Sequence, residues 1–88
     1  DGDFALHVSG DSMEPDIPDG SIVVIKKQSE IADGISGAFF LNGEVYCKKM
    51  IHKGGRVFLC SNNTEYRPIE VHESDNLMVY GKIVKVIN

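Results

Sequence analysis

Short apolar runs separated by polar turns dominate this chain, and their pattern predicts β-strands. Runs rich in β-branched and aromatic residues and bounded by glycine, proline, asparagine or aspartate are typical of strands. The expected strands are residues 4–8, 21–25, 38–41, 44–52, 56–60, 69–71 and 77–87. Because tight turns join them, the pattern predicts an all-β, mainly antiparallel fold of short strands and hairpins.

Several positions refine this prediction. Asn42-Gly43 is the strongest hairpin signal, because both central residues of a type I′ turn need positive φ. The continuous apolar run 21–25 predicts a strand that is covered on both faces. Gly81, inside the last strand, indicates a bulge or a close approach of two backbones. Residues 10–20 contain two prolines that exclude a continuous helix, although one helical turn fits at residues 13–16.

A pair of lysines interrupts the apolar strand 44–52. Successive side chains point to opposite faces, so Lys48 lies on one face with Tyr46 and Met50, while Lys49 lies on the other. Whichever face is inward, one lysine is pressed against apolar neighbours. Either both lysines keep their ammonium groups in water, or one amine is buried. Burial would lower the pKa of that lysine and leave a neutral amine that can act as a general base.

The turn at 53–55 decides which residue of the next strand faces the lysine. If this turn pairs His52 with Arg56, Lys48 lies opposite Cys60. A register shift of one residue would give Lys48 a different partner, because it moves every pair along the strand.

A small, polar and sharply turned segment, residues 8–15, lies between the first two expected strands. Gly10-Asp11-Ser12 is common turn chemistry, so the serine alone is a weak signal. Rigid flanking strands can nevertheless present a hydroxyl group, and nucleophiles tend to occupy such positions. A serine becomes a nucleophile when a neutral amine reaches it, as in Ser–Lys variants of the catalytic triad. Ser12 and Lys48 are therefore the candidate catalytic pair.

Composition narrows the classes of function. The chain has 88 residues, which corresponds to one domain, and its 13 acidic and 9 basic residues give a net charge of −4. A negative net charge argues against direct binding of nucleic acid, which needs a basic face. No apolar run is long enough to span a membrane, and the residues show no signal-peptide pattern. Cys47 and Cys60 lie in apolar runs without CxxC spacing, which predicts buried free thiols in a reducing compartment.

Together these motifs resemble the C-terminal domain of the LexA-like serine peptidases, a family that includes LexA, UmuD and phage repressors of the lambda type. The resemblance covers nearly the whole chain, with the motifs in the same order. The matching segments are residues 9–13, 18–20, 44–50, 57–69 and 79–84.

The resemblance implies a role for each matched residue. Ser12 corresponds to the nucleophile that attacks a peptide bond in the protein's own linker, and Lys48 corresponds to the general base. The backbone amides of Asp11 and Ser12 correspond to the oxyanion hole, and no cofactor or metal is implied. Family members form homodimers or higher oligomers. Their cleavage is stimulated by the RecA–nucleoprotein filament after DNA damage, and they bind DNA through an N-terminal domain.

The sequence lacks two parts of the family pattern: the scissile Ala-Gly or Cys-Gly pair and the DNA-binding domain. We therefore expect residues 1–88 to be one self-cleavage and dimerisation domain from a longer protein of the bacterial cytoplasm. The amino-acid sequence of residues 12–20 is most like that of a prophage repressor. Two alternatives remain, a dimerisation module without active self-cleavage and a UmuD-like protein of the DNA-damage response. Retention of both Ser12 and Lys48 favours the peptidase.

Two other classes fit less well. GDSL esterases share the Gly10-Asp11-Ser12-Met13 wording, but they need a larger α/β fold and a late Asp-x-x-His that the chain lacks. The three histidines are scattered without metal-ligand spacing, so no metal site is predicted.

Overall fold

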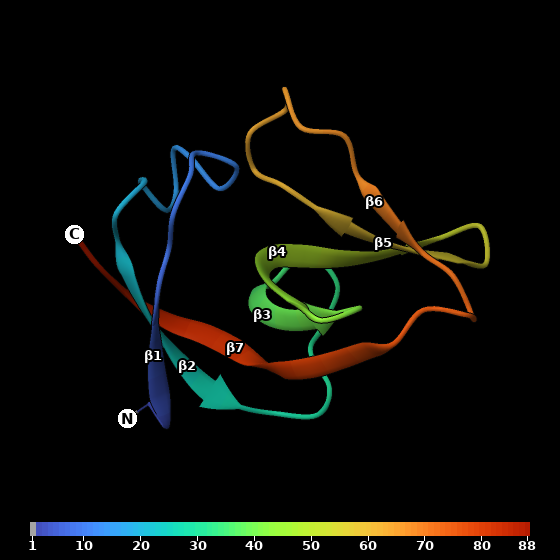
Figure 1. Cartoon of the computed structure of the whole chain (residues 1–88), viewed down its shortest axis with the longest axis horizontal. Helices are drawn as coiled ribbons and strands as arrows, with labels where there is room; N and C mark the ends of the chain where they lie inside the picture. The colour runs from blue at the N-terminus through green and yellow to red at the C-terminus, as the bar shows by residue number, and fades with distance from the viewer. Residues whose placement is uncertain (1) are drawn as a thin grey trace.

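The computed structural model describes residues 2–88, which form one curled antiparallel sheet of seven strands (Figure 1). The strands are β1 (Phe4–His7), β2 (Ile22–Lys27), β3 (Ser36–Leu41), β4 (Glu44–Lys53), β5 (Arg56–Cys60), β6 (Ile69–Val71) and β7 (Leu77–Ile87). The prediction of an all-β, antiparallel fold is confirmed. The described residues contain no helix that is long and apolar enough to cross a membrane.

The C-terminal strand lies in the middle of the sheet. The strand order is β1-β2-β7-β3-β4-β5-β6, so β7 pairs with β2 along one edge and with β3 along the other. Gly81 of β7 is buried where these strands meet, and a Cβ atom there would overlap the carbonyl oxygen of Lys26. The pairing of β3 with β7 is irregular beside it, between Ala38 and Phe39. The predicted close approach at Gly81 is therefore confirmed.

Strand β2 differs from its prediction in both bounds and burial. It begins at Ile22 and continues through Lys27, beyond the expected residues 21–25. Val23 and Ile25 are fully buried, but Ile22 is 41% exposed. The prediction of a strand covered on both faces is therefore wrong, because the outer face of a single curled sheet has no second layer to cover it.

Two tight hairpins set the register of the central strands. Asn42 and Gly43 have φ angles of 50° and 90°, as the predicted turn requires. Gly54 and Gly55 also have positive φ and close a two-residue turn, so Lys53 pairs with Arg56.

This second turn corrects the expected position of Lys48. The pairing of Lys53 with Arg56 shifts the register of β4 against β5 by one residue, and Lys49 rather than Lys48 pairs with Cys60. The prediction that Lys48 lies opposite Cys60 is wrong, because the turn has two central residues where three were expected.

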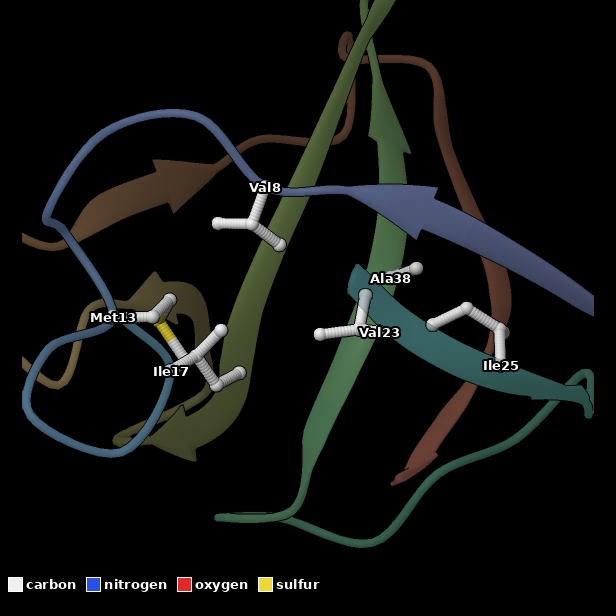
Figure 2. Packing of buried hydrophobic residues seen from close by; sticks show 6 residues of the cluster. All are labelled: Val8, Met13, Ile17, Val23, Ile25 and Ala38. Carbon is white, nitrogen blue, oxygen red and sulfur yellow. The ribbon is translucent and has the colours of Figure 1, made fainter. Parts of the chain in front are cut away.

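Buried side chains form two clusters. The first cluster contains Val8, Met13, Ile17, Val23, Ile25 and Ala38 (Figure 2). Met13 and Ile17 lie side by side in it and belong to the irregular segment between β1 and β2. The backbone N–H of Ile17 donates to the carbonyl of Met13 at 2.9 Å and closes a tight turn, but residues 13–16 form no helix, so the helical turn that fitted there is not found. The second cluster contains Phe39, Leu41, Met50 and Leu59.

Candidate active site

The turn that carries Ser12 is fixed to the fold on both sides. Met13, the next residue, is 1% exposed and anchors the turn in the first cluster (Figure 2). The backbone N–H of Gly10 donates to the Asp19 carboxylate at 2.7 Å, and the N–H of Gly20 donates to the carbonyl of Val8 at 2.9 Å. These bonds close the segment into a loop. Ser12 is half-buried on this loop, as a hydroxyl that must meet a substrate requires.

Lys48 is buried, as expected for one lysine of the pair. It lies on the inward face of β4 with Met50 and is only 7% exposed. Its Nζ atom donates a hydrogen bond to Ser61 Oγ at 2.7 Å. The same atom lies 5.8 Å from the ring centroids of both Tyr46 and Tyr66. Lys49 faces the other way, is half-buried, and lies 4.0 Å from Asp16.

Burial lowers the pKa of Lys48 below its ordinary value, because the ammonium form loses its hydration. The nearby Cys47 and Cys60 thiols act in the opposite direction and partly offset this effect. Both cysteines are free, as predicted, but they are half-buried rather than buried. Burial also raises the pKa of Cys47, and the charge of Lys48 partly opposes that rise. The lysine therefore has the property that a general base needs, a neutral amine at a pH below that of an exposed lysine.

Ser12 and Lys48 line one hollow of about 240 Å³, together with residues of β1 and β4 such as Leu6 and Tyr46. The structure therefore brings together two candidate residues that are 36 positions apart in the sequence, Ser12 and Lys48. In residues 2–88 the side-chain hydrogen bond of Lys48 goes to Ser61 and not to Ser12. In this structure Ser12 and Lys48 therefore share a hollow without a hydrogen bond between them, and hydrogen-bond reach in a cleavage-competent state stays a prediction.

Among residues 2–88, the two backbone amides expected to form an oxyanion hole have no hydrogen-bond acceptor. Within the described part of the chain, the N–H groups of Asp11 and Ser12 donate no hydrogen bond, whereas the carbonyl of Asp11 accepts one from the N–H of Glu14 at 3.1 Å. Two neighbouring N–H groups without an internal partner can donate hydrogen bonds to a carbonyl oxygen and stabilise the negative charge that develops on it.

Residues 61–66, which follow β5, hold the Ser12 loop in place, and we call them the clamp segment. The backbone N–H of Asn63 donates to the carbonyl of Ser12 at 2.9 Å, and its side-chain amide donates to the carbonyl of Asp11 at 3.2 Å. The side-chain amide of Asn62 donates to the carbonyl of Met13 at 3.2 Å and to the Asp16 carboxylate at 3.0 Å. The clamp segment therefore bonds three successive carbonyl groups around Ser12.

Tyr66 connects the two halves of the site. Its hydroxyl donates a short hydrogen bond to the carboxylate of Asp11, while its ring lies beside the amine of Lys48. This hydrogen bond raises the pKa of Tyr66, because the carboxylate opposes loss of the phenol proton. The side chain thus contacts both the serine loop and the catalytic lysine candidate.

Replacing Asn63 by alanine is expected to lower the free energy of unfolding by about 1–2 kcal/mol, because its amide oxygen and nitrogen lose partners in the Ser12 loop and at Glu65. Urea denaturation measures the change. Thr64→Ala, at the exposed neighbouring position, is the matched control and is expected to change stability by less than about 0.5 kcal/mol. Equal stability of the two variants would contradict the clamping role.

Sequence reasoning identified Ser12 and Lys48 but assigned no role in the site to residues 61–65. Ser61 could have been found from the turn, since a two-residue Gly54-Gly55 turn places Ser61, and not Cys60, beside Lys48. Asn62 and Asn63 could not, because they contact residues 46 to 52 positions away and leave no local signal.

The histidine side chains lie apart from one another and contact different segments. Nε2 of His7 lies 3.1 Å from the carbonyl of Gly20, and His52 pairs with Asp33 at 2.7 Å. Among residues 2–88 no group of three histidine, cysteine, aspartate or glutamate side chains is arranged as a metal site.

Comparison with known proteins shows the family of the chain. Residues 1–84 match the family model described as Peptidase S24-like. The LexA repressor of Thermosipho africanus is 39% identical over 85 residues, which cover 96% of this chain and 42% of that protein. The LexA repressor of Aliivibrio fischeri is 37% identical over 87 residues, which cover 97% of this chain and 42% of that protein. The chain thus spans about two fifths of these relatives, and it belongs to the Peptidase S24-like family as a LexA-like serine peptidase domain.

Proposed function

We propose that this chain is the self-cleavage and dimerisation domain, residues 1–88, of a LexA-type transcriptional repressor. Ser12 is the nucleophile, Lys48 is the general base, and the backbone amides of Asp11 and Ser12 form the oxyanion hole. The substrate is a peptide bond in the linker that precedes this domain in the parent protein. The observation that carries the proposal is the buried amine of Lys48 in the same hollow as the hydroxyl of Ser12.

The proposed reaction uses the neutral amine twice. Lys48 Nζ takes the proton from Ser12 Oγ as this oxygen attacks the carbonyl carbon of the linker, and the two backbone amides bind the resulting oxyanion. The ammonium then returns the proton to the leaving amine, so the peptide bond breaks and an ester on Ser12 remains. A water molecule, deprotonated by Lys48, hydrolyses this ester and restores the serine.

The test is self-cleavage of the full-length parent protein. It is incubated at about pH 10 without an activator, and mass spectrometry follows the fragments. One cut in the linker that disappears in the Ser12→Ala variant supports the proposal. An intact parent under the same conditions would favour the alternative, a dimerisation module that does not cleave itself.

Partners follow from the same proposal. The relatives are named LexA repressor, and this chain covers 42% of the first two of them, which leaves room in such proteins for a separate DNA-binding domain. We place DNA binding in that N-terminal domain because the present chain carries a net charge of −4. The RecA–nucleoprotein filament is the proposed activator. The proposed setting is the cytoplasm of a bacterial host, with a prophage repressor as the type of parent.

The outer face of β2 and β7 supports self-association. Ile22 pairs with Ile87 across the two strands, and these side chains and Val84 are 41 to 44% exposed. Ile87→Lys is expected to shift the sedimentation coefficient of the parent from dimer to monomer, because it places a charge in this apolar patch. Met78→Lys is the control, since Met78 is 58% exposed but pairs with β3 at the other end of β7. A dimer unaffected by Ile87→Lys would place the interface elsewhere.

A further inference from the structure

Ser61 is the polar side chain that holds the buried amine. Its Oγ accepts the hydrogen bond from Lys48 Nζ at 2.7 Å, a short distance for an N–H donor. The register explains this contact. Lys49 pairs with Cys60, the last residue of β5. Ser61, the residue that follows β5, therefore lies beside Lys48.

The other surroundings of the amine offer little to orient it. On the opposite side of β4, Lys48 pairs with Gly37, which has no side chain. The rings of Tyr46 and Tyr66, each 5.8 Å away, attract a positive charge but do not fix the direction of individual N–H bonds. Within the part of the chain that the structure describes, Ser61 is the one side-chain hydrogen-bond partner of Lys48.

Proton transfer depends on where the lone pair of the neutral amine points. A neutral amine has two N–H bonds and one lone pair, and it rotates about the Cε–Nζ bond. When one N–H is donated to Ser61 Oγ, this rotation is restricted and the lone pair can be held toward the hollow that Ser12 lines. A base held in this orientation need not be ordered again at the moment of reaction.

We propose that Ser61 is a positioning residue of the proposed Ser12–Lys48 pair, whose hydroxyl fixes the amine of Lys48 in the orientation that accepts the proton of Ser12. This inference rests on the proposed function and extends it. The clamp segment then serves both halves of the site, because Ser61 holds the base while Asn62 and Asn63 hold the loop of the nucleophile.

The position of Ser61 also affects the charge of the lysine. Its oxygen accepts a hydrogen bond that stabilises the ammonium form, so removal of the hydroxyl is expected to lower the pKa of Lys48 further. The other titratable or charged groups that line the site or act on the amine are His7, Asp11, Tyr46, Cys47, Cys60, Tyr66 and Arg67. Ser61→Ala leaves all of these in place, so a change in pH dependence reports the lost hydroxyl.

The experiment measures self-cleavage of the full-length parent between about pH 7 and pH 11 in the wild type, Ser61→Ala, Ser61→Thr and Ser74→Ala. Ser61→Ala is expected to reduce the maximal rate about tenfold, as for loss of one hydrogen bond to a reacting group. The pH midpoint of the rate is expected to move down. Ser61→Thr keeps a hydroxyl and is expected to restore both values. Ser74→Ala, at an exposed turn, is the matched control and is expected to match the wild type.

Each alternative outcome is distinguishable. A Ser61→Ala profile identical to that of the wild type, or one with a faster maximal rate, would overturn the positioning role and leave the proposed function standing. A lower rate with an unchanged midpoint and no rescue by Ser61→Thr would show general disruption and would also overturn it. A wild-type parent that never cleaves, like its Ser12→Ala variant, would overturn the proposed function and this inference together.

Discussion

Replacing Ser12 by alanine is expected to abolish self-cleavage of the parent protein, with a loss of at least about 1,000-fold in rate. The reason is chemical: alanine has no oxygen to attack the linker, and the two free backbone amides cannot supply one. The fold is expected to stay intact, because the neighbouring Met13 rather than Ser12 anchors the loop in the core. Fragments are quantified by mass spectrometry after incubation at alkaline pH.

The matched control for this variant is Ser29→Ala, in the exposed segment between β2 and β3. It is expected to cleave at the wild-type rate. Circular dichroism and sedimentation of the Ser12 variant should match those of the wild type, which separates loss of chemistry from loss of structure. Cleavage of Ser12→Ala at the wild-type rate would remove this residue from the mechanism.

The second large effect is the dependence of the rate on pH. Burial lowers the pKa of Lys48, and only the neutral amine can accept the proton of Ser12. The rate is therefore expected to rise about tenfold per pH unit while the ammonium predominates, and to level off above the pKa of Lys48. Because that pKa is below the ordinary lysine value of 10.5, the plateau should begin earlier than for an exposed lysine. A rate that stays constant from neutral to strongly alkaline pH would exclude Lys48 as the base.

Lys48→Met tests the same residue directly. Methionine keeps much of the apolar stem but has no amine, so the rate is expected to fall about 100- to 10,000-fold, the usual contribution of a general base. The matched control is Lys49→Met on the opposite face of β4, which is expected to retain self-cleavage and its pH dependence. If the two variants lost activity equally, the effect would come from strand β4 as a whole and not from the buried amine.

The free energy of unfolding of the domain also depends on pH through Lys48. The folded state disfavours the ammonium of Lys48, so between the pKa of the folded state and that of an unfolded lysine the unfolded chain binds more protons than the folded chain. The free energy of unfolding therefore gains a contribution from this residue as pH rises through the folded pKa toward that of an unfolded lysine.

Local signals in the sequence predicted most of the fold. Turn residues such as Asn42-Gly43 act through their own φ angles, and alternation along β4 showed that one of two adjacent lysines must face inward. Of the two possibilities that the sequence left for the inward lysine, an amine in water or a buried amine, the structure has the buried one. Which partner it meets depended on the turn at Gly54-Gly55, where a difference of one residue exchanged Cys60 for Ser61.

Other features lay beyond sequence reasoning because they depend on how the complete sheet curls and brings distant segments together. The exposure of Ile22 follows from the absence of a second layer over β2, which a continuous apolar run does not reveal. The bonds from Asn62 and Asn63 to the Ser12 loop join segments that become neighbours only after folding. For the same reason, the position of Tyr66 between Asp11 and Lys48 could not be read from spacing.

The central position of β7 has a consequence for the timing of activity during synthesis. The loop of Ser12 follows β1, whereas Lys48 belongs to β4, and β7 is the strand that joins the β1–β2 part of the sheet to the β3–β6 part. A ribosome makes β7 after every other strand of this chain. While the chain is growing, the β1–β2 part and the β3–β6 part of the sheet are not yet joined, so Ser12 and Lys48, the proposed nucleophile and base, are not yet held in one hollow. If the proposed self-cleavage operates, the growing parent protein would be protected from cutting itself until this domain is complete.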